Sequence, residues 1–222
     1  ELSSLRRDGV LLVRDLGSGN LLRDERLGAD FEPTVSSELS QGADLVCFSG
    51  DKLLGSCQAG IIVGRKDLVA SLRKNPLMRM LRVDKITYFI LQETLLRYAN
   101  DKTESIALWE IVGRDAREIE RTATRLVRTV KNPRKKDCIR RVGVSSTYGG
   151  GSLPTREIAS AGVCITVPGV SADELYARFI DEEIPVVGYI LDDRFTLDLR
   201  TVLPDDIPVL AASIDRMLDG GA

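Results

Sequence analysis

The chain contains no histidine among its 222 residues. This absence excludes serine–histidine triads, imidazole general bases and most transition-metal sites from the chemistry that these residues could carry. Any proton transfer must use lysine, aspartate, glutamate, tyrosine or cysteine, or a group of the substrate.

Long apolar runs are missing as well, because no stretch approaches the roughly 20 apolar residues of a membrane span. We therefore expect no membrane partner. The four cysteines are widely spaced and form no CxxC pair. Cys47 and Cys164 lie in apolar, strand-like runs and are predicted to be buried thiols, which fits a protein of the reducing cytoplasm.

A strong net charge is also lacking, since the formal charge is −2 and the pI is about 5.4. Bulk charge therefore does not indicate nucleic-acid binding. One stretch is nevertheless basic, and its cations are Arg121, Arg125, Arg128, Lys131, Arg134, Lys135, Lys136, Arg140 and Arg141. A solvated helix face and a contact with an RNA acceptor stem or backbone both remain open interpretations.

Apolar patterning predicts an α/β arrangement in the first part of the chain. Strands are expected at 9–15, 44–49 and 60–64, the first two parallel and buried, with helices from 33 to 40 and at 66–73. A long helix over 82–100, with an apolar stripe along it, could connect two domains. We therefore predict two domains, at 1–100 and 101–222.

The second part of the chain is predicted to form an α+β two-layer domain. Helices are expected at 103–113, 115–130, 171–182 and 205–218, and strands at 138–145, 161–167, 185–190 and 194–199. The helix over 171–182 begins with a capping box formed by Ser171 and Glu174.

The segment Ser49-Gly50-Asp51-Lys52-Leu53-Leu54-Gly55 follows the predicted strand at 44–49. A lysine on a tight turn at a buried strand end can be desolvated and can act as an amine nucleophile, as required to hold pyridoxal phosphate as a Schiff base. Ser49 and the nearby glycines offer a hydroxyl and backbone N–H groups to a phosphate. A solvated lysine at a strand end is the simpler interpretation.

Asp15 ends the first predicted strand, just before Gly17-Ser18-Gly19. A pyridoxal enzyme needs a carboxylate against the pyridine nitrogen. The distance in sequence from Asp15 to Lys52 leaves room for a crossover between two parallel strands. An ordinary turn aspartate is the alternative.

These motifs resemble the bacterial selenocysteine synthase family, the L-seryl-tRNA(Sec) selenium transferases. The resemblance continues over nearly the whole chain in family order, through Gln58–Gly64, Asn75–Lys85, Gly149–Pro154, Asp192–Arg194 and Leu197–Thr201. It implies the C-terminal part of a fold-type-I pyridoxal-phosphate-dependent transferase large domain, followed by the α+β domain. It also implies conversion of seryl-tRNA(Sec) to selenocysteinyl-tRNA(Sec) with selenophosphate.

The resemblance also implies roles for individual residues. Lys52 would bind the cofactor and act as a base, Asp15 would face the ring nitrogen, and Ser49 would bind the cofactor phosphate. Asp51 would lie near the substrate and the selenium donor, and Arg79 and Arg82 would bind selenophosphate from one helix face. Arg200 has either a substrate-binding or a structural role, and Gly149-Gly150-Gly151 could allow close backbone approach.

The loop after the lysine departs from the family, because Gly55-Ser56-Cys57-Gln58 replaces the usual Gly-Gly-Pro-Gln. The chain begins at Glu1 without a methionine, and family members are about twice as long. We therefore expect a C-terminal fragment that is inactive alone and that belongs to a homo-oligomer built from dimers.

Two alternatives stay open at this point. One is a related pyridoxal-phosphate-dependent lyase acting on a small amino sugar or amino acid. The other is a non-catalytic fragment that assembles with other chains or binds tRNA.

Overall fold

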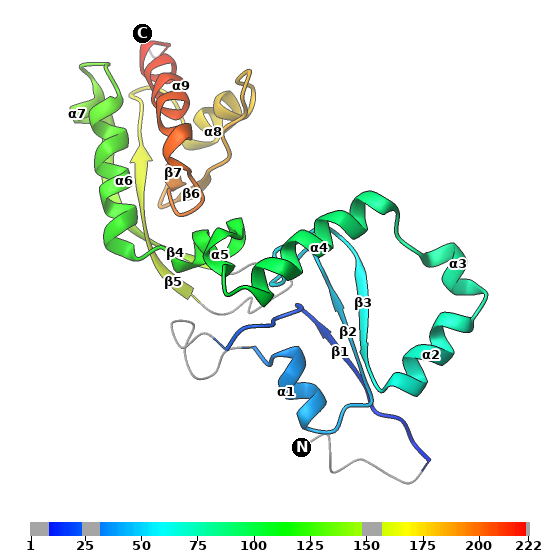
Figure 1. The fold of residues 1–222 in the computed structure, drawn as a ribbon. Coiled ribbons are helices and arrows are strands. Elements are labelled where there is room, and N and C mark those ends of the chain that lie inside the picture. Colours follow the sequence, from blue (N-terminus) through cyan, green and yellow to red (C-terminus); the bar gives the residue numbers. More distant parts are fainter. Residues whose placement is uncertain (1–8, 24–31, 148–156, 221–222) are drawn as a thin grey trace. The chain divides into compact units, whose positions relative to one another are not determined.

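The computed structural model describes residues 9–23, 32–147 and 157–220. These residues form two compact units, one reaching Gly113 and the other starting at Arg114 (Figure 1). Residues 101–113 were predicted to belong to the second domain but pack within the first unit, where Trp109 Nε1 donates a hydrogen bond to Tyr98 Oη at 2.6 Å. The predicted division into functional domains stays a prediction.

The first unit contains a three-stranded sheet of β1 (Val13–Gly17), β2 (Leu45–Ser49) and β3 (Gly60–Gly64), in that order. β1 and β2 are parallel, as predicted, and β2 and β3 are antiparallel. Helix α1 (Val35–Ser40) lies in the connection from β1 to β2 and begins at the N-cap Thr34. The buried cluster here consists of Leu16, Val35, Val46, Phe48 and Leu54.

The prediction that the first strand is buried is wrong for its beginning. β1 starts at Val13 rather than at residue 9, and Val10, Leu11 and Val13 are 50–56% exposed. The physical reason is that β1 pairs only with β2 among the described residues and is therefore an edge strand of this sheet.

The remaining elements of the first unit are helices. They are α2 (Lys66–Lys74), α3 (Leu77–Leu81), α4 (Lys85–Ala99), the 3-10 turn η3 (Thr103–Ser105) and α5 (Ala107–Gly113). The long helix predicted from residue 82 begins at Lys85, because the Asp84 carboxylate accepts a hydrogen bond from Thr87 N as its N-cap. The apolar stripe of α4 is largely exposed, with Ile86 at 71% and Phe89 at 64%.

The second unit begins with α6 (Ala116–Thr129) and α7 (Lys135–Cys138), followed by β4 (Ile139–Thr147) and β5 (Glu157–Ile165). The chain continues through α8 (Ala172–Ile180), β6 (Tyr189–Leu191), β7 (Arg194–Asp198), η4 (Pro204–Asp206) and α9 (Ile207–Asp219). The sheet is antiparallel, in the order β4-β5-β7-β6.

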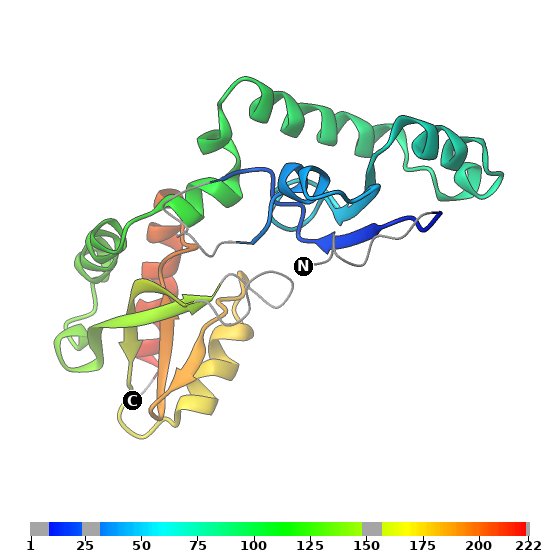
Figure 2. The same ribbon diagram turned by 90° about the horizontal axis from the view of Figure 1, so that it is seen from below.

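One face of this sheet is covered by α6, α8 and α9 (Figures 1 and 2). Alternate residues of β5 and β7, such as Val163 and Leu197, form a single core with the apolar sides of these helices. The α+β two-layer prediction is confirmed. The strand predicted at 185–190 is shorter, since Val186 N donates to Phe179 O at the end of α8 instead of joining the sheet. No helix of the described residues is long and apolar enough to cross a membrane.

Candidate active site

Lys52 lies in the turn that follows β2, at the edge where β1 and β2 both end. Two backbone hydrogen bonds shape this turn, from Leu53 N to Ser18 O and from Gly55 N to Lys52 O, both at 2.8 Å. Lys52 Nζ lies 3.8 Å from the position that a Cβ on Gly17 would occupy, and Gly17 has φ +71°. The lysine amine therefore reaches back to the glycine turn after β1, as a parallel pair of strands allows.

Asp15 lies two residues before Gly17, and its register partner on β2 is Cys47. Burial raises the pKa of the Cys47 thiol, and the negative charge of Asp15 raises this pKa further. Cys47 is half-buried, so the prediction of a buried thiol is wrong for Cys47 but confirmed for Cys164. Asp15, within β1, and Lys52, in the turn that follows β2, thus lie at the same end of two neighbouring parallel strands.

Ser49 and Asp51 are joined directly, because Ser49 Oγ donates a hydrogen bond to Asp51 Oδ1 at 2.5 Å. This bond is the main reason that the pKa of Asp51 is lowered, and the charge of Lys52 lowers the pKa further. The Ser49 hydroxyl must rotate away from Asp51 before it can donate to a phosphate.

A hydrogen-bond network that was not predicted from the sequence lies next to the lysine turn. Tyr98 Oη accepts from Trp109 Nε1 and lies 3.0 Å from Leu54 O and 3.3 Å from Leu53 O, the two carbonyls that follow Lys52. Burial raises the pKa of Tyr98 to about 12, although the bond from Trp109 acts in the opposite direction. The only signal in the sequence is that Trp109 is the single tryptophan.

The loop residues that depart from the family also contact α4. Ser56 Oγ and Thr94 Oγ1 are 2.9 Å apart, and Cys57 Sγ donates to Thr87 O at 3.8 Å. Thr94 is only 7% exposed, so the hydroxyl of Ser56 provides a partner for a buried polar group. The altered loop is therefore fixed to α4 by its own side chains.

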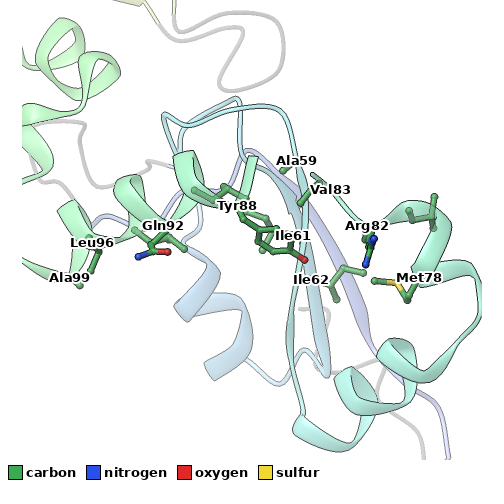
Figure 3. Close-up of a pocket in the computed structure, with 14 residues that line it drawn as sticks. Ala59, Ile61, Ile62, Met78, Arg82, Val83, Tyr88, Gln92, Leu96 and Ala99 are labelled. Carbon is green, nitrogen blue, oxygen red and sulfur yellow. The ribbon is translucent and has the colours of Figure 1, made fainter. Parts of the chain in front are cut away.

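Arg79 and Arg82 do not share one helix, because α3 ends at Leu81 and Arg82 is its C-cap in extended backbone. Both side chains are exposed. Arg82 lines a pocket of about 680 Å³ between β3, α3 and α4, whereas Arg79 is not part of that lining (Figure 3). The pocket is mostly apolar, and Tyr88 and Gln92 add the other polar side chains. Within the described residues, Lys52 is not part of the lining of this pocket.

Arg200 has a structural position in the second unit. It is 4% exposed, and its Nη1 and Nη2 donate to Arg114 O at 3.0 Å and to Ala159 O at 2.7 Å. The segment Gly149-Gly150-Gly151 lies outside the described residues.

Comparison with known proteins identifies close relatives. Residues 1–203 match the family described as "SelA: L-seryl-tRNA selenium transferase". The L-seryl-tRNA(Sec) selenium transferase of Hyphomonas neptunium is 42% identical over 214 residues, covering 94% of this chain and 45% of the relative. The enzyme of the same name from Geobacter sulfurreducens is 38% identical over 222 residues, covering 98% and 48%.

Among solved structures, a D-glucosaminate-6-phosphate ammonia-lyase superposes with a TM-score of 0.59 at 18% identity, over 96% of this chain and 50% of that chain. This likeness concerns the fold, which is that of fold-type-I pyridoxal-phosphate enzymes. The chain spans about half the length of the curated relatives that it matches. By the match over most of its length, the chain belongs to the SelA family of L-seryl-tRNA selenium transferases.

Proposed function

We propose that this chain is the pyridoxal-phosphate-carrying part of an enzyme that converts L-seryl-tRNA(Sec) to L-selenocysteinyl-tRNA(Sec) with selenophosphate. One observation carries the proposal: in a member of this family, the Lys52 amine lies beside the glycine turn that follows Asp15. The relatives at 38–42% identity carry this enzyme name, while the ammonia-lyase is 18% identical. Family membership therefore favours the transferase over the amino-sugar lyase.

The residues at this edge fit pyridoxal phosphate. Gly17 places no side chain beside the Lys52 amine, and a Cβ at this position would lie in van der Waals contact with Nζ, at 3.8 Å. Asp15 would face the pyridine nitrogen, and the Ser49 hydroxyl would turn from Asp51 to the phosphate. Bound cofactor supplies the electron sink that permits loss of the serine β-hydroxyl. Lys52 would remove the α-proton of the seryl group, and Asp51, held ionised by Ser49, would orient groups near the amine.

Arg79 and Arg82 would hold selenophosphate. An arginine offers a fixed fork of donors to an oxyanion, and neither arginine has a carboxylate partner among the described residues. Arg82 supplies a positive charge in the lining of its pocket, so an anion can bind at the guanidinium without entering the apolar part.

Assembly into a homo-oligomer is part of the same proposal. The surface around this pocket exposes large apolar side chains, including Leu81 on α3 and Phe89 on α4. Exposed apolar patches of this kind are typical of protein interfaces. We also place the enzyme in the reducing cytoplasm, where thiols such as those of the four free cysteines persist.

The experiment is borohydride reduction of the cofactor-loaded full-length protein, followed by peptide mass mapping. We expect the phosphopyridoxyl group on Lys52, and Lys52→Ala should abolish the label. Lys66→Ala, on exposed α2, is the matched control and should leave it unchanged. A label on another lysine would reject the proposed site. Formation of selenocysteinyl-tRNA then separates the transferase from a lyase.

Arg79→Ala and Arg82→Ala should each weaken the use of selenophosphate, while borohydride still labels Lys52. Losing one charge-assisted hydrogen bond of about 1.5–3 kcal/mol lowers donor affinity about 10- to 150-fold. Arg73→Ala, on neighbouring α2, is the control. An unchanged selenophosphate dependence in both variants would reject the role.

The 222-residue chain alone should bind the cofactor weakly and show no turnover. It matches only about half of each relative, so stacking and phosphate contacts from the rest of the protein are expected to be missing. Tight stoichiometric binding with turnover would show the opposite. Oligomer formation without cofactor binding by the full-length protein would favour the non-catalytic alternative.

A further inference from the structure

A row of arginines runs along one side of α6. Arg117, Arg121, Arg125 and Arg128 are all exposed and follow one another at spacings of four, four and three residues. These spacings place them on one face of a helix. The buried residues Ile119, Ala123 and Leu126 lie on the opposite side, against the core of the second unit. We call these four arginines the α6 arginine row.

The C-terminal half of the α6 arginine row has no acidic neighbour on the helix, whereas Arg117 and Arg121 have Glu120 and Glu118 three positions away. None of its members forms a salt bridge within the described part of the chain, whereas Arg178 on α8 pairs with Glu174 and Arg216 on α9 pairs with Glu182. No carboxylate stands three or four positions from Arg125 or Arg128. Like charges at these spacings destabilise a helix by about 0.2–0.5 kcal/mol per pair. An external anion would relieve this repulsion.

Strand β4 extends the cationic surface beside α6. Arg141 Nη1 donates to Thr124 Oγ1 at 2.8 Å, which fixes this side chain against the helix. Arg140 and Arg141 are exposed and line a recess of about 460 Å³ between α6 and the sheet. Glu120 is the single carboxylate in its lining. The cations therefore come from two elements that are packed together in one unit.

We propose that the α6 arginine row, with Arg140 and Arg141, binds the phosphate backbone of a folded RNA. Successive arginines stand about 4.5–6 Å apart along the helix axis, so the row can follow a line of phosphates. Guanidinium groups match phosphate oxygens in a bidentate fork. α6 carries no aromatic residue on which a base could stack, so the contact reads the backbone rather than the bases. The identity of the RNA as a tRNA rests on the proposed function.

The expected signature is a dependence of binding on salt. Each neutralised phosphate contributes roughly 0.7–0.9 to the slope of log K against log salt concentration. The double variant Arg125→Ala/Arg128→Ala should therefore show a slope that is smaller in magnitude by about 1.5. Each single substitution should reduce the magnitude by about half as much. Alanine favours helix at both positions, so α6 should remain folded.

The test is fluorescence anisotropy of a labelled tRNA transcript with the 222-residue chain, measured over a range of salt concentrations. Arg194→Ala is the matched control, because it removes one exposed arginine of the same unit from β7 rather than from α6. We expect the control to keep the wild-type slope, and circular dichroism to show equal helix content in all variants.

Several results would overturn the proposal. They are no binding of the transcript by the wild-type chain, an unchanged slope in the double variant, or an equal effect of Arg194→Ala. Arginine-dependent binding to anionic phospholipid vesicles without such binding to the transcript would identify a lipid surface instead. If the full-length protein makes selenocysteinyl-tRNA but the double arginine variant keeps the wild-type salt dependence, only the proposed RNA surface is refuted. If the full-length protein makes no selenocysteinyl-tRNA but the double variant has a weaker salt dependence, only the proposed reaction is refuted.

Discussion

Tyr98→Phe should destabilise the first unit although it removes a single oxygen atom. The phenyl ring stays in place, but Trp109 Nε1 loses its acceptor and Leu54 O loses its nearest hydroxyl. Trp109 is 4% exposed and Leu54 is fully buried, so water cannot readily replace the lost partner. The substitution therefore leaves buried polar groups unsatisfied rather than removing a complete pair.

The magnitude follows from these two groups. Each unsatisfied buried donor or acceptor costs about 1–3 kcal/mol, and partial relaxation of the turn reduces the sum. We expect the free energy of unfolding of the first unit to fall by about 2–4 kcal/mol. Because the two carbonyls near Tyr98 Oη directly follow Lys52, the lysine turn should also exchange its amide hydrogens faster.

The assay is urea unfolding followed by the fluorescence of Trp109, which is the single tryptophan and lies in the network itself. Tyr88→Phe is the matched control, since Tyr88 lies on the same helix but is 60% exposed. A Tyr98→Phe stability within about 0.5 kcal/mol of wild type would refute the reasoning, because that is the range of neutral surface changes.

The same network predicts that the stability of the first unit falls at alkaline pH. The pKa of Tyr98 is raised to about 12 in the folded state, above the ordinary tyrosine pKa of about 10. The stabilising effect of the neutral hydroxyl is therefore complete below about pH 10 and is lost as the pH rises from there towards 12. Tyr98→Phe should lose less stability than wild type over this window; an identical loss would contradict the assignment.

Three further substitutions test other parts of the structure. Arg200→Met should lower the stability of the second unit by about 2–4 kcal/mol, because the carbonyls of Arg114 and Ala159 lose hydrogen bonds from a buried, charged donor, and hydrogen exchange along β5 would show it. Gly64→Ala should destabilise the first unit by more than about 1 kcal/mol in urea unfolding, because φ is +147° and a Cβ would lie 2.2 Å from the backbone oxygen of Asp44. Gly60→Ala is the control, because a Cβ at Gly60 has no neighbouring atom within 4 Å. Ser49→Ala should raise the pKa of Asp51 towards its ordinary value in a carboxyl NMR titration, and an unchanged pKa would show that the hydroxyl has no influence.

Much of the local structure could be predicted from short-range patterns. The parallel pairing of β1 with β2 is confirmed, and so is the two-layer arrangement of the second unit. Ser171 caps α8 as expected, because its side chain accepts from Glu174 N. The rest of the predicted capping box is wrong, because the side chain of Glu174 accepts from Arg178 Nη2 at 2.7 Å instead. The start of the long helix was wrong by three residues, because the capping strength of Asp84 outweighed the apolar pattern around it.

The sequence by itself determined the family, the order of the strands and of the helices other than the short α3 and α7, and the residue types at the end of β2, since these depend on motifs and short-range periodicity. Only the tertiary structure decided that the Lys52 amine lies beside Gly17 and that Tyr98 and Trp109 support the turn from behind. It also decided that Arg200 binds backbone carbonyls and that Arg82 stands outside the helix of Arg79. These features depend on strand register, helix caps and contacts between distant residues, which residue spacing alone does not encode.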